Sequence, residues 1–144
     1  MTLHAPYDPA NIFAKILRGE MPSVKIFEDE VALAFMDVFP QVEGHTLVIP
    51  KGVSARNFLD LPETALGDYM LRVQKVARAM ETGLKPDGLR VVQFNGAPAG
   101  QTVFHLHFHI MPVWEGVKMD AHGAGGMKSA AELEPMAARI RAVF

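Results

Sequence analysis

Three histidines separated by single apolar residues stand in the second half of the chain. His105, His107 and His109 lie in the stretch Phe-His-Leu-His-Phe-His-Ile-Met-Pro, residues 104–112. Strict alternation of this kind is typical of a β-strand with one buried face. We therefore expect a strand over 104–112 whose imidazoles project to one side while the apolar side chains cover a core. Gathered imidazoles can bind a metal ion or handle a phosphoryl or acyl group.

These two chemistries make different geometric demands. A catalytic zinc ion takes three imidazoles within about 2.1 Å and keeps a fourth position open. Alternate residues from His105 to His109 spread over about 13 Å along a strand, which is awkward for one ion. A neutral imidazole can instead attack phosphorus and form a covalent intermediate, while its neighbours donate protons and hydrogen bonds. Clustering favours the neutral form. The spacing favours the nucleophile over the metal site, so we expect no metal. A metal-dependent hydrolase is kept as a further alternative.

The remaining periodicity predicts the elements that position these histidines. Apolar stripes and capping signals predict three helices. The first covers about residues 9–18, the second runs from Asp60 to Gly83, and the third follows a capping box that begins at Ser129. Short apolar runs predict strands over 24–27, 31–37, 45–50 and 88–95, the first two as a hairpin. The segment 114–128 has little periodicity and is expected to be a loop. No repeat or domain boundary interrupts the chain, so residues 1–144 are expected to form one domain, with 113–144 as a C-terminal loop and helix extension.

Two polar positions and one loop border the histidine strand in this scheme. Asp37 ends a strand, where a carboxylate either forms a turn or binds ligand hydroxyls. His45 begins the next strand. The turn-rich stretch from Asn95 to Gln101 leads directly into the histidines. It serves either as a simple hairpin connection or as a cradle whose backbone N–H groups bind phosphate oxygens.

Composition narrows the classes of protein. The chain has 144 residues, a formal net charge of −2 and no cysteine, which excludes disulfides and thiolate metal sites. No run of Lys or Arg indicates a nucleic-acid surface. No window resembles a membrane span, and the stretch from Met1 to Asp8 lacks a signal-peptide pattern. We expect a soluble, unexported, cytoplasmic protein that binds neither nucleic acid nor membrane.

Several stretches together resemble the histidine-triad (HIT) superfamily of nucleotide hydrolases and transferases. The resemblance covers roughly residues 10–115. It is carried by the triad itself and by the stretches Ile12-Phe-Ala-Lys-Ile16, Phe27-Glu-Asp29, Ala34-Phe-Met-Asp37, Gly44-His-Thr-Leu-Val-Ile-Pro-Lys51 and Asn95 to Thr102. It implies an α+β fold with a five-stranded antiparallel sheet, usually in a homodimer whose sheets join.

The same resemblance implies roles for individual residues. His107 corresponds to the residue that attacks the α-phosphorus, and His109 to the one that assists the leaving group. His105 and His45 complete the polar cluster, and Asp37 matches the residue that holds the ribose hydroxyls. The base pocket is matched by Ile12, Phe13, Phe35 and Val38. The phosphate-side contacts are matched by Asn95, Gln101, Thr102 and Val103.

The resemblance therefore implies a hydrolase or transferase that acts on a purine nucleotide derivative without a cofactor. Phosphoramidases and dinucleoside polyphosphate hydrolases fit the motifs equally well. The alternative is a nucleotide-binding regulatory protein with little turnover. Many bacterial members bind a structural zinc through two cysteines near the first helix. Here Asn11 and Ala14 occupy that region, so we expect this zinc to be missing.

Overall fold

The computed structural model describes residues 3–144. The stretch from Met1 to Asp8, which was expected to lack a signal-peptide pattern, includes Met1 and Thr2, and these two lie outside the described residues. Within residues 3–144 the structure contains five strands, three α-helices and two short 3-10 helices. In chain order these are α1 (Ile12–Leu17), β1 (Lys25–Glu28), β2 (Ala32–Met36), β3 (Thr46–Pro50), η1 (Phe58–Asp60), α2 (Glu63–Leu84), β4 (Gly88–Val92), η2 (Ala97–Ala99), β5 (Phe108–Val113) and α3 (Ala130–Arg141).

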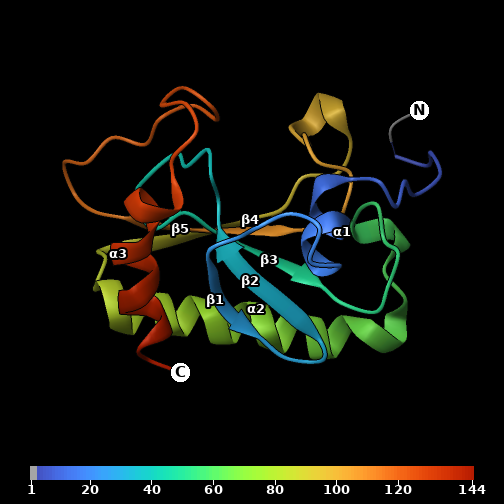
Figure 1. Ribbon diagram of the computed structural model, residues 1–144, viewed down its shortest axis with the longest axis horizontal. Coiled ribbons are helices and arrows are strands. Elements are labelled where there is room, and N and C mark those ends of the chain that lie inside the picture. Colours follow the sequence, from blue (N-terminus) through green and yellow to red (C-terminus); the bar gives the residue numbers. More distant parts are fainter. Residues whose placement is uncertain (1–2) are drawn as a thin grey trace.

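The described strands form one antiparallel sheet in the order β1-β2-β3-β5-β4. The predicted α+β fold with a five-stranded antiparallel sheet is thereby confirmed. Figure 1 shows the long α2 running across one face of the sheet, with α3 near one end of α2 and the short α1 on the opposite side. Among residues 3–144, no helix is both long and apolar enough to span a bilayer.

Alternation along the central strands divides the core into two clusters. Ala32, Ala34 and Met36 of β2 face the larger cluster, which also contains residues of α2 and α3. Leu33 and Phe35 point the other way, into a smaller cluster that includes Phe13 and Ile16 of α1. Since successive side chains on a strand alternate between faces, the sheet is covered on both sides. The side with α1 is the one that bears the imidazoles.

Two of the predicted helices have different ends in the structure. The first helix was expected to begin at Pro9, but α1 begins at Ile12, because the side chain of Asn11 accepts the Ala14 N–H (2.9 Å) and forms the N-cap. Asp60 was expected to cap the second helix. It instead lies in η1 and its carboxylate accepts the Arg56 N–H (3.2 Å), so that α2 begins at Glu63.

The far end of α2 also differs from the expectation. The helix passes through Gly83 and ends at Leu84, and Lys85 takes the left-handed conformation with φ 52°. Gly83 serves packing, since a Cβ at this position would lie 2.5 Å from the Arg139 carbonyl oxygen of α3. The buried face of α2 contains Tyr69 and Val76, whereas Leu66 of the same helix is 36% exposed. The expected capping box of Ser129 and Glu132 at α3 is confirmed.

The predicted strand over 88–95 is too long, because β4 ends at Val92. Beyond it the chain enters a loop through Gln93 and Asn95, whose side-chain amides bond each other (2.8 and 2.9 Å). Residues 114–128 contain neither helix nor strand, which confirms the expected loop. β4 is one outer strand of the sheet and β1 is the other.

Candidate active site

The predicted histidine strand over 104–112 is wrong in its first half, because β5 begins at Phe108. The pairing of β5 with β3 places Val48 opposite Phe108. Continuing that register would place Pro50 opposite Leu106, and proline has no N–H to donate. The Leu106 N–H donates instead to the carbonyl of Ala55 (2.9 Å). His105 and His107 therefore lie in irregular chain just before the strand.

The imidazoles nevertheless share one side of this segment. The ring of Phe13 lies 6.3 Å from that of His105 and 5.0 Å from that of His107 between centroids. The rings of His107 and His109 are 4.9 Å apart. Leu106, between His105 and His107, and Ile110, directly after His109, are fully buried in the larger core cluster on the other side. The expected division into an imidazole side and a core side is confirmed.

His107 is held by the backbone of its neighbour. Its Nδ1 lies 2.6 Å from the carbonyl oxygen of His105. A carbonyl can only accept, so Nδ1 carries the proton and donates it. In a neutral imidazole the other nitrogen, Nε2, then has a lone pair and no proton. His107 is 6% exposed. The backbone thus sets the tautomer that a nucleophile requires.

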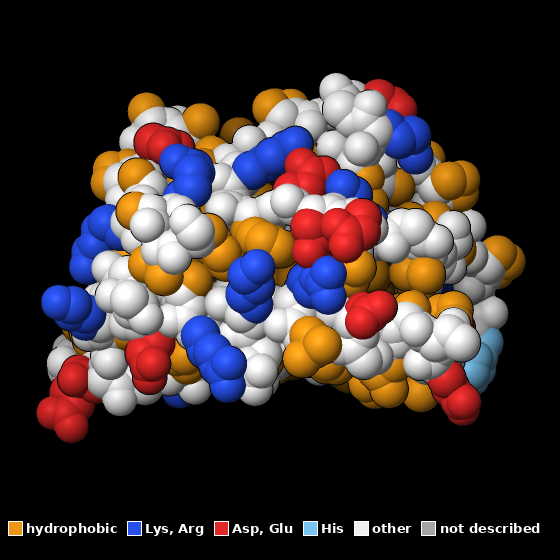
Figure 2. All heavy atoms as spheres, turned by 90° about the horizontal axis from the view of Figure 1, so that it is seen from below, with side chains coloured by type: hydrophobic (Ala, Val, Ile, Leu, Met, Phe, Trp, Pro, Cys, Tyr) orange, Lys and Arg blue, Asp and Glu red, His pale blue; other side chains and the backbone are white. Residues whose placement is uncertain are grey.

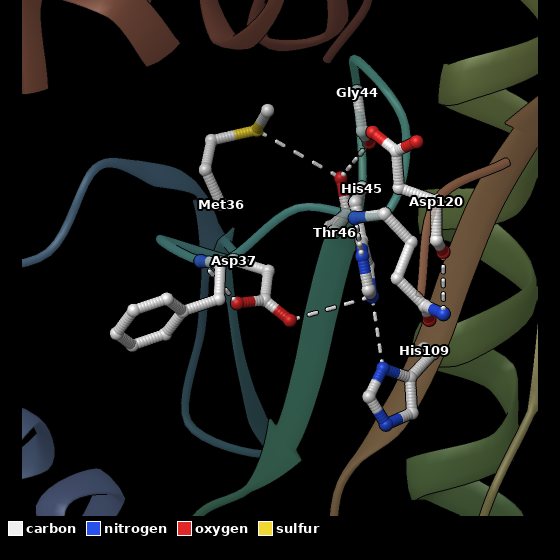
Figure 3. Close-up of polar contacts among 9 residues, drawn as sticks. Met36, Asp37, Gly44, His45, Thr46, His109 and Asp120 are labelled. Carbon is white, nitrogen blue, oxygen red and sulfur yellow. Dashed lines mark hydrogen bonds and ion pairs between the residues drawn. The ribbon is translucent and has the colours of Figure 1, made fainter. Parts of the chain in front are cut away.

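A second chain of contacts fixes the protons of His45 and His109. The backbone N–H of Gln41 donates to His45 Nδ1 (3.1 Å), so the His45 proton sits on Nε2. That Nε2 lies 2.9 Å from His109 Nδ1 and 3.4 Å from an Asp37 carboxylate oxygen. Figure 3 shows Asp37, His45 and His109 arranged in this order. His109 Nδ1 therefore accepts, which places the His109 proton on Nε2 as a donor.

Burial keeps these histidines neutral at neutral pH. It is the largest cause that lowers the pKa of His45 and of His105 to about 4 and that of His109 to about 3. Burial also lowers the pKa of His107, whereas the carbonyl of His105 and the charge of Asp37 act to raise it. Like-charge repulsion among the rings acts in the same direction but is smaller. The neutral form was expected from clustering, whereas burial is its main cause.

The apolar residues matched to a base pocket lie in different places. The rings of Phe13 and Phe35 meet edge to face at 5.3 Å in the smaller core cluster. Ile12 lies beside Phe13 on α1 and is 42% exposed. Val38 packs against the larger core cluster. The structure therefore joins an aromatic pair directly to the triad through Phe13, with Ile12 at the surface next to it.

The loop matched to phosphate contacts is braced by Gln101. The side-chain amide of this buried residue donates to the carbonyls of Arg56 (2.7 Å) and Val103 (3.1 Å) and accepts the Gly96 N–H (2.8 Å). All of its hydrogen-bonding groups are thus used to shape the loop. Asn95 has a similar role, since its Oδ1 accepts the Phe58 N–H (2.9 Å).

The other two residues of that loop differ in exposure. Val103 is half-buried and packs against the smaller core cluster, whereas Thr102 is exposed. Of the four residues matched to phosphate contacts, Thr102 is therefore the one whose side chain points to the surface.

Tyr7 is a site residue that the sequence reasoning missed. Its hydroxyl lies 2.7 Å from Nδ1 of His105, although the two residues are 98 positions apart. Nε2 of His105 is buried without a hydrogen-bond partner among residues 3–144. The tyrosine thus provides a hydrogen-bond partner for Nδ1 of this buried imidazole. A lone tyrosine outside any periodic segment carries no signal that could have indicated this contact.

Comparisons with known proteins agree with this geometry. The family model for the HIT domain matches residues 18–116. The protein named "Protein hit" from Bacillus subtilis is 41% identical over 86% of this chain and 83% of its own length. The crystal structure of a Hit-like protein from Bartonella henselae superposes with a TM-score of 0.88 at 45% identity, covering 96% of this chain and all of the other. The chain belongs to the HIT domain family.

A further relative of this HIT domain has a named activity. The adenosine 5′-monophosphoramidase HNT1 from Saccharomyces cerevisiae is 42% identical over 78% of this chain and 68% of its own length. This yeast enzyme is thus about as similar in sequence to the chain as the bacterial relative is.

One group of side chains in this HIT domain has the composition of a metal site. Asp37, His45 and His109 place one ligand atom each within 4.8 Å of the others. The sequence offered no acid beside the histidines along their own strand, and Asp37 reaches them from the end of β2. A metal on His45 Nε2 would require the proton to move to Nδ1, where it would face the Gln41 N–H. Two donors would then oppose each other, so the hydrogen bonds favour a proton relay over a metal.

Proposed function

We propose that this HIT domain transfers the nucleotidyl group of a purine nucleoside phosphoramidate or dinucleoside polyphosphate to His107 and then to water or another acceptor. The observation that carries the proposal is the bond from His107 Nδ1 to the His105 carbonyl. It leaves an unprotonated Nε2 in a neutral ring, which is the form that attacks phosphorus. The similarity to the yeast phosphoramidase supports this substrate class.

The proton positions support a two-step mechanism. In the first step His107 Nε2 forms a bond to the α-phosphorus, and the bond from phosphorus to the leaving nitrogen or oxygen breaks. His109 Nε2–H gives its proton to the leaving group. The loss of this proton leaves a negative charge on His109, which the hydrogen bond from His45 Nε2–H to His109 Nδ1 (2.9 Å) stabilises. In the second step water attacks the same phosphorus, gives its proton back to His109 and releases His107.

The surrounding residues support nucleotide binding in distinct ways. We assign the aromatic pair Phe13 and Phe35, with Ile12 beside them, to the base, whereas Val38 packs against the larger core cluster. Asp37 uses Oδ1 to accept the Phe39 N–H (2.8 Å), which leaves Oδ2, beside His45, for a ribose hydroxyl. We assign Thr102 and the backbone around Val103 to the phosphate, whereas Gln101 and Asn95 act by holding the loop that carries them.

Replacing the nucleophile tests this proposal. His107→Ala should lower kcat with adenosine 5′-monophosphoramidate by about 10³-fold or more, because no other lone pair occupies that position. AMP binding, measured by calorimetry, should stay within a few-fold, since the base and ribose contacts lie elsewhere. Phe108→Leu, next to His107 but on the core side, is the matched control and should keep most of the turnover. Turnover that survives in His107→Ala would refute the covalent step.

The alternative is a nucleotide-binding regulatory protein with little turnover. Wild-type protein that binds AMP tightly but releases none from phosphoramidate or dinucleoside polyphosphate would favour it. The buried, tautomer-ordered relay from His45 to His109 favours the enzyme, because simple binding needs no aligned proton donors.

We also infer that two copies associate through β4. This outer strand leaves one row of backbone N–H and C=O groups without a neighbouring strand. Val91 of β4 is 49% exposed and Leu71 of α2 is 58% exposed. Figure 2 shows the face seen from below, where apolar side chains lie between scattered charges of both signs. Val91→Lys should convert a dimer to a monomer in sedimentation equilibrium, and a monomeric wild type would refute the association.

A further inference from the structure

The segment that joins β5 to α3 folds back beside the active site. We call residues 114–128 the C-terminal flap and residues 37–45 the β2–β3 loop. The Asp120 N–H donates to the Gln41 carbonyl (2.8 Å), and the Gln41 side-chain amide donates to the Asp120 carbonyl (3.0 Å). The Lys128 N–H donates to the Val38 carbonyl (2.8 Å). Figure 3 shows Asp120 next to the loop that carries His45.

The anchor of the flap is also a contact of the site. Gln41 donates its backbone N–H to His45 Nδ1 and thereby sets the tautomer of the proton relay. The same residue receives the flap through its carbonyl and its side chain. Gln41 therefore connects the flap directly to a catalytic histidine.

The flap carries a fifth imidazole close to these histidines. The ring of His122 lies 6.3 Å from that of Phe39 on the β2–β3 loop. The charge of His122 lowers the pKa of His45, of His107 and of His109. His122 is exposed to solvent. It thus lies on the exposed flap beside Phe39 rather than among the buried rings.

The buried histidines provide no positive charge for an anionic substrate. His45, His105 and His109 are neutral at neutral pH, because burial lowers the pKa of each. They can donate hydrogen bonds to one phosphoryl group but offer no positive charge to a longer phosphate chain. Asp37 adds a negative charge on the same side. An exposed imidazole on the flap can donate a hydrogen bond to a phosphate oxygen, and hydrogen bonds to charged groups are the stronger ones.

We propose that His122 is a specificity-determining residue that contacts the anionic leaving group of polyphosphate substrates, beyond the α-phosphate. This inference rests on the proposed nucleotidyl transfer at His107 and assigns the flap to one of its two substrate classes. A phosphoramidate has a small leaving group without a phosphate chain, so it does not extend to His122. The flap therefore favours dinucleoside polyphosphates over phosphoramidates.

The test compares two substrates in matched variants. His122→Ala should lower kcat/KM for diadenosine triphosphate by about tenfold, the size of one lost hydrogen bond to a charged group. The same variant should change kcat/KM for adenosine 5′-monophosphoramidate less than twofold. Lys118→Gln removes a different cation from the flap and should leave both values unchanged. Because His122 and Lys118 are exposed, circular dichroism should show wild-type folding for both variants.

The outcomes separate this inference from the proposed function. An equal loss for both substrates would overturn it, since that would indicate general positioning, and so would a loss for neither. If the wild type cleaves neither substrate, the proposed function fails, and calorimetry with AMP and ATP then decides the role of His122. In that case His122→Ala should weaken ATP binding about tenfold and leave AMP binding unchanged. Unchanged ATP binding would overturn the assignment.

Discussion

Buried neutral histidines should make the protein unusually sensitive to mild acid. The pKa of His105 falls from 6.5 to about 4 on folding, and that of His45 from 6.5 to about 4. The pKa of His109 falls from 6.5 to about 3. Each unit corresponds to about 1.4 kcal/mol, so His105 alone contributes roughly 3 kcal/mol of pH-dependent stability. Because the folded pKa is the lower one, this stability is complete above about pH 6.5 and is lost as the pH falls toward 4.

The slope of this loss follows from proton uptake. Near pH 5 each of the three histidines is protonated in the unfolded chain and mostly neutral in the folded one. Unfolding then takes up nearly three protons, so the free energy of unfolding should fall by roughly 4 kcal/mol between pH 6 and pH 5. That is a large part of the total stability expected for a domain of this size.

Urea denaturation at several pH values measures this slope, with the fluorescence of the single Trp114 as the probe. His105→Gln removes one of the three titrating groups. Its slope between pH 6 and pH 5 should be shallower by about 1.4 kcal/mol per pH unit, whatever its stability at pH 7. Gln74→Ala, on the exposed face of α2, removes no titratable group and is the control, which should keep the full slope. Equal slopes in wild type and His105→Gln would refute the reasoning, since the carboxylates are common to both proteins.

Three other perturbations test separate parts of the structure. Tyr7→Phe leaves a buried nitrogen of His105 without its 2.7 Å partner and should cost about 1–3 kcal/mol in urea denaturation; an unchanged midpoint would show that the contact contributes nothing. Gly83→Ala places a Cβ 2.5 Å from the Arg139 carbonyl oxygen and should destabilise by about 1–3 kcal/mol. Gly67→Ala in the same helix meets no atom within 4 Å and should stabilise by up to about 1 kcal/mol; the same sign of change in both variants would contradict the packing argument. Dialysis against a strong chelator should leave turnover unchanged, because His45 holds its proton on the nitrogen that a metal would need, and activity restored only by zinc would contradict this.

Short apolar runs were sufficient to predict the strands, whereas their arrangement in one five-stranded antiparallel sheet was implied by the resemblance to the HIT superfamily. Leu33 and Phe35 face one cluster while Ala34 and Met36 face the other, but all four are apolar, so the run predicts the strand and not which residues face which cluster. The capping box at Ser129 is likewise encoded by residues three positions apart. Features of this kind depend on neighbours along the chain, and the sequence alone predicts them well.

Element ends depend on distant residues and were predicted less well. Gly83 looks like a helix terminator, yet it is required inside α2 because α3 crosses there. The histidine segment alternates as a strand would, yet its first half leaves the sheet because the Leu106 N–H bonds Ala55. In both cases the partner lies tens of residues away. A local pattern therefore places these residues on the correct side but assigns them the wrong backbone conformation.

The chemistry of the site depends on proton positions, which no local pattern encodes. The proton of His107 is fixed by a carbonyl two residues away, but that of His45 is fixed by Gln41 across a turn. The proton of His109 follows in turn from His45, which is 64 positions distant. The triad spacing thus indicates which residues take part, whereas their division into nucleophile and proton donor follows from tertiary hydrogen bonds. A change at Gln41 that disturbs the backbone should therefore affect catalysis even though its side chain touches no histidine ring.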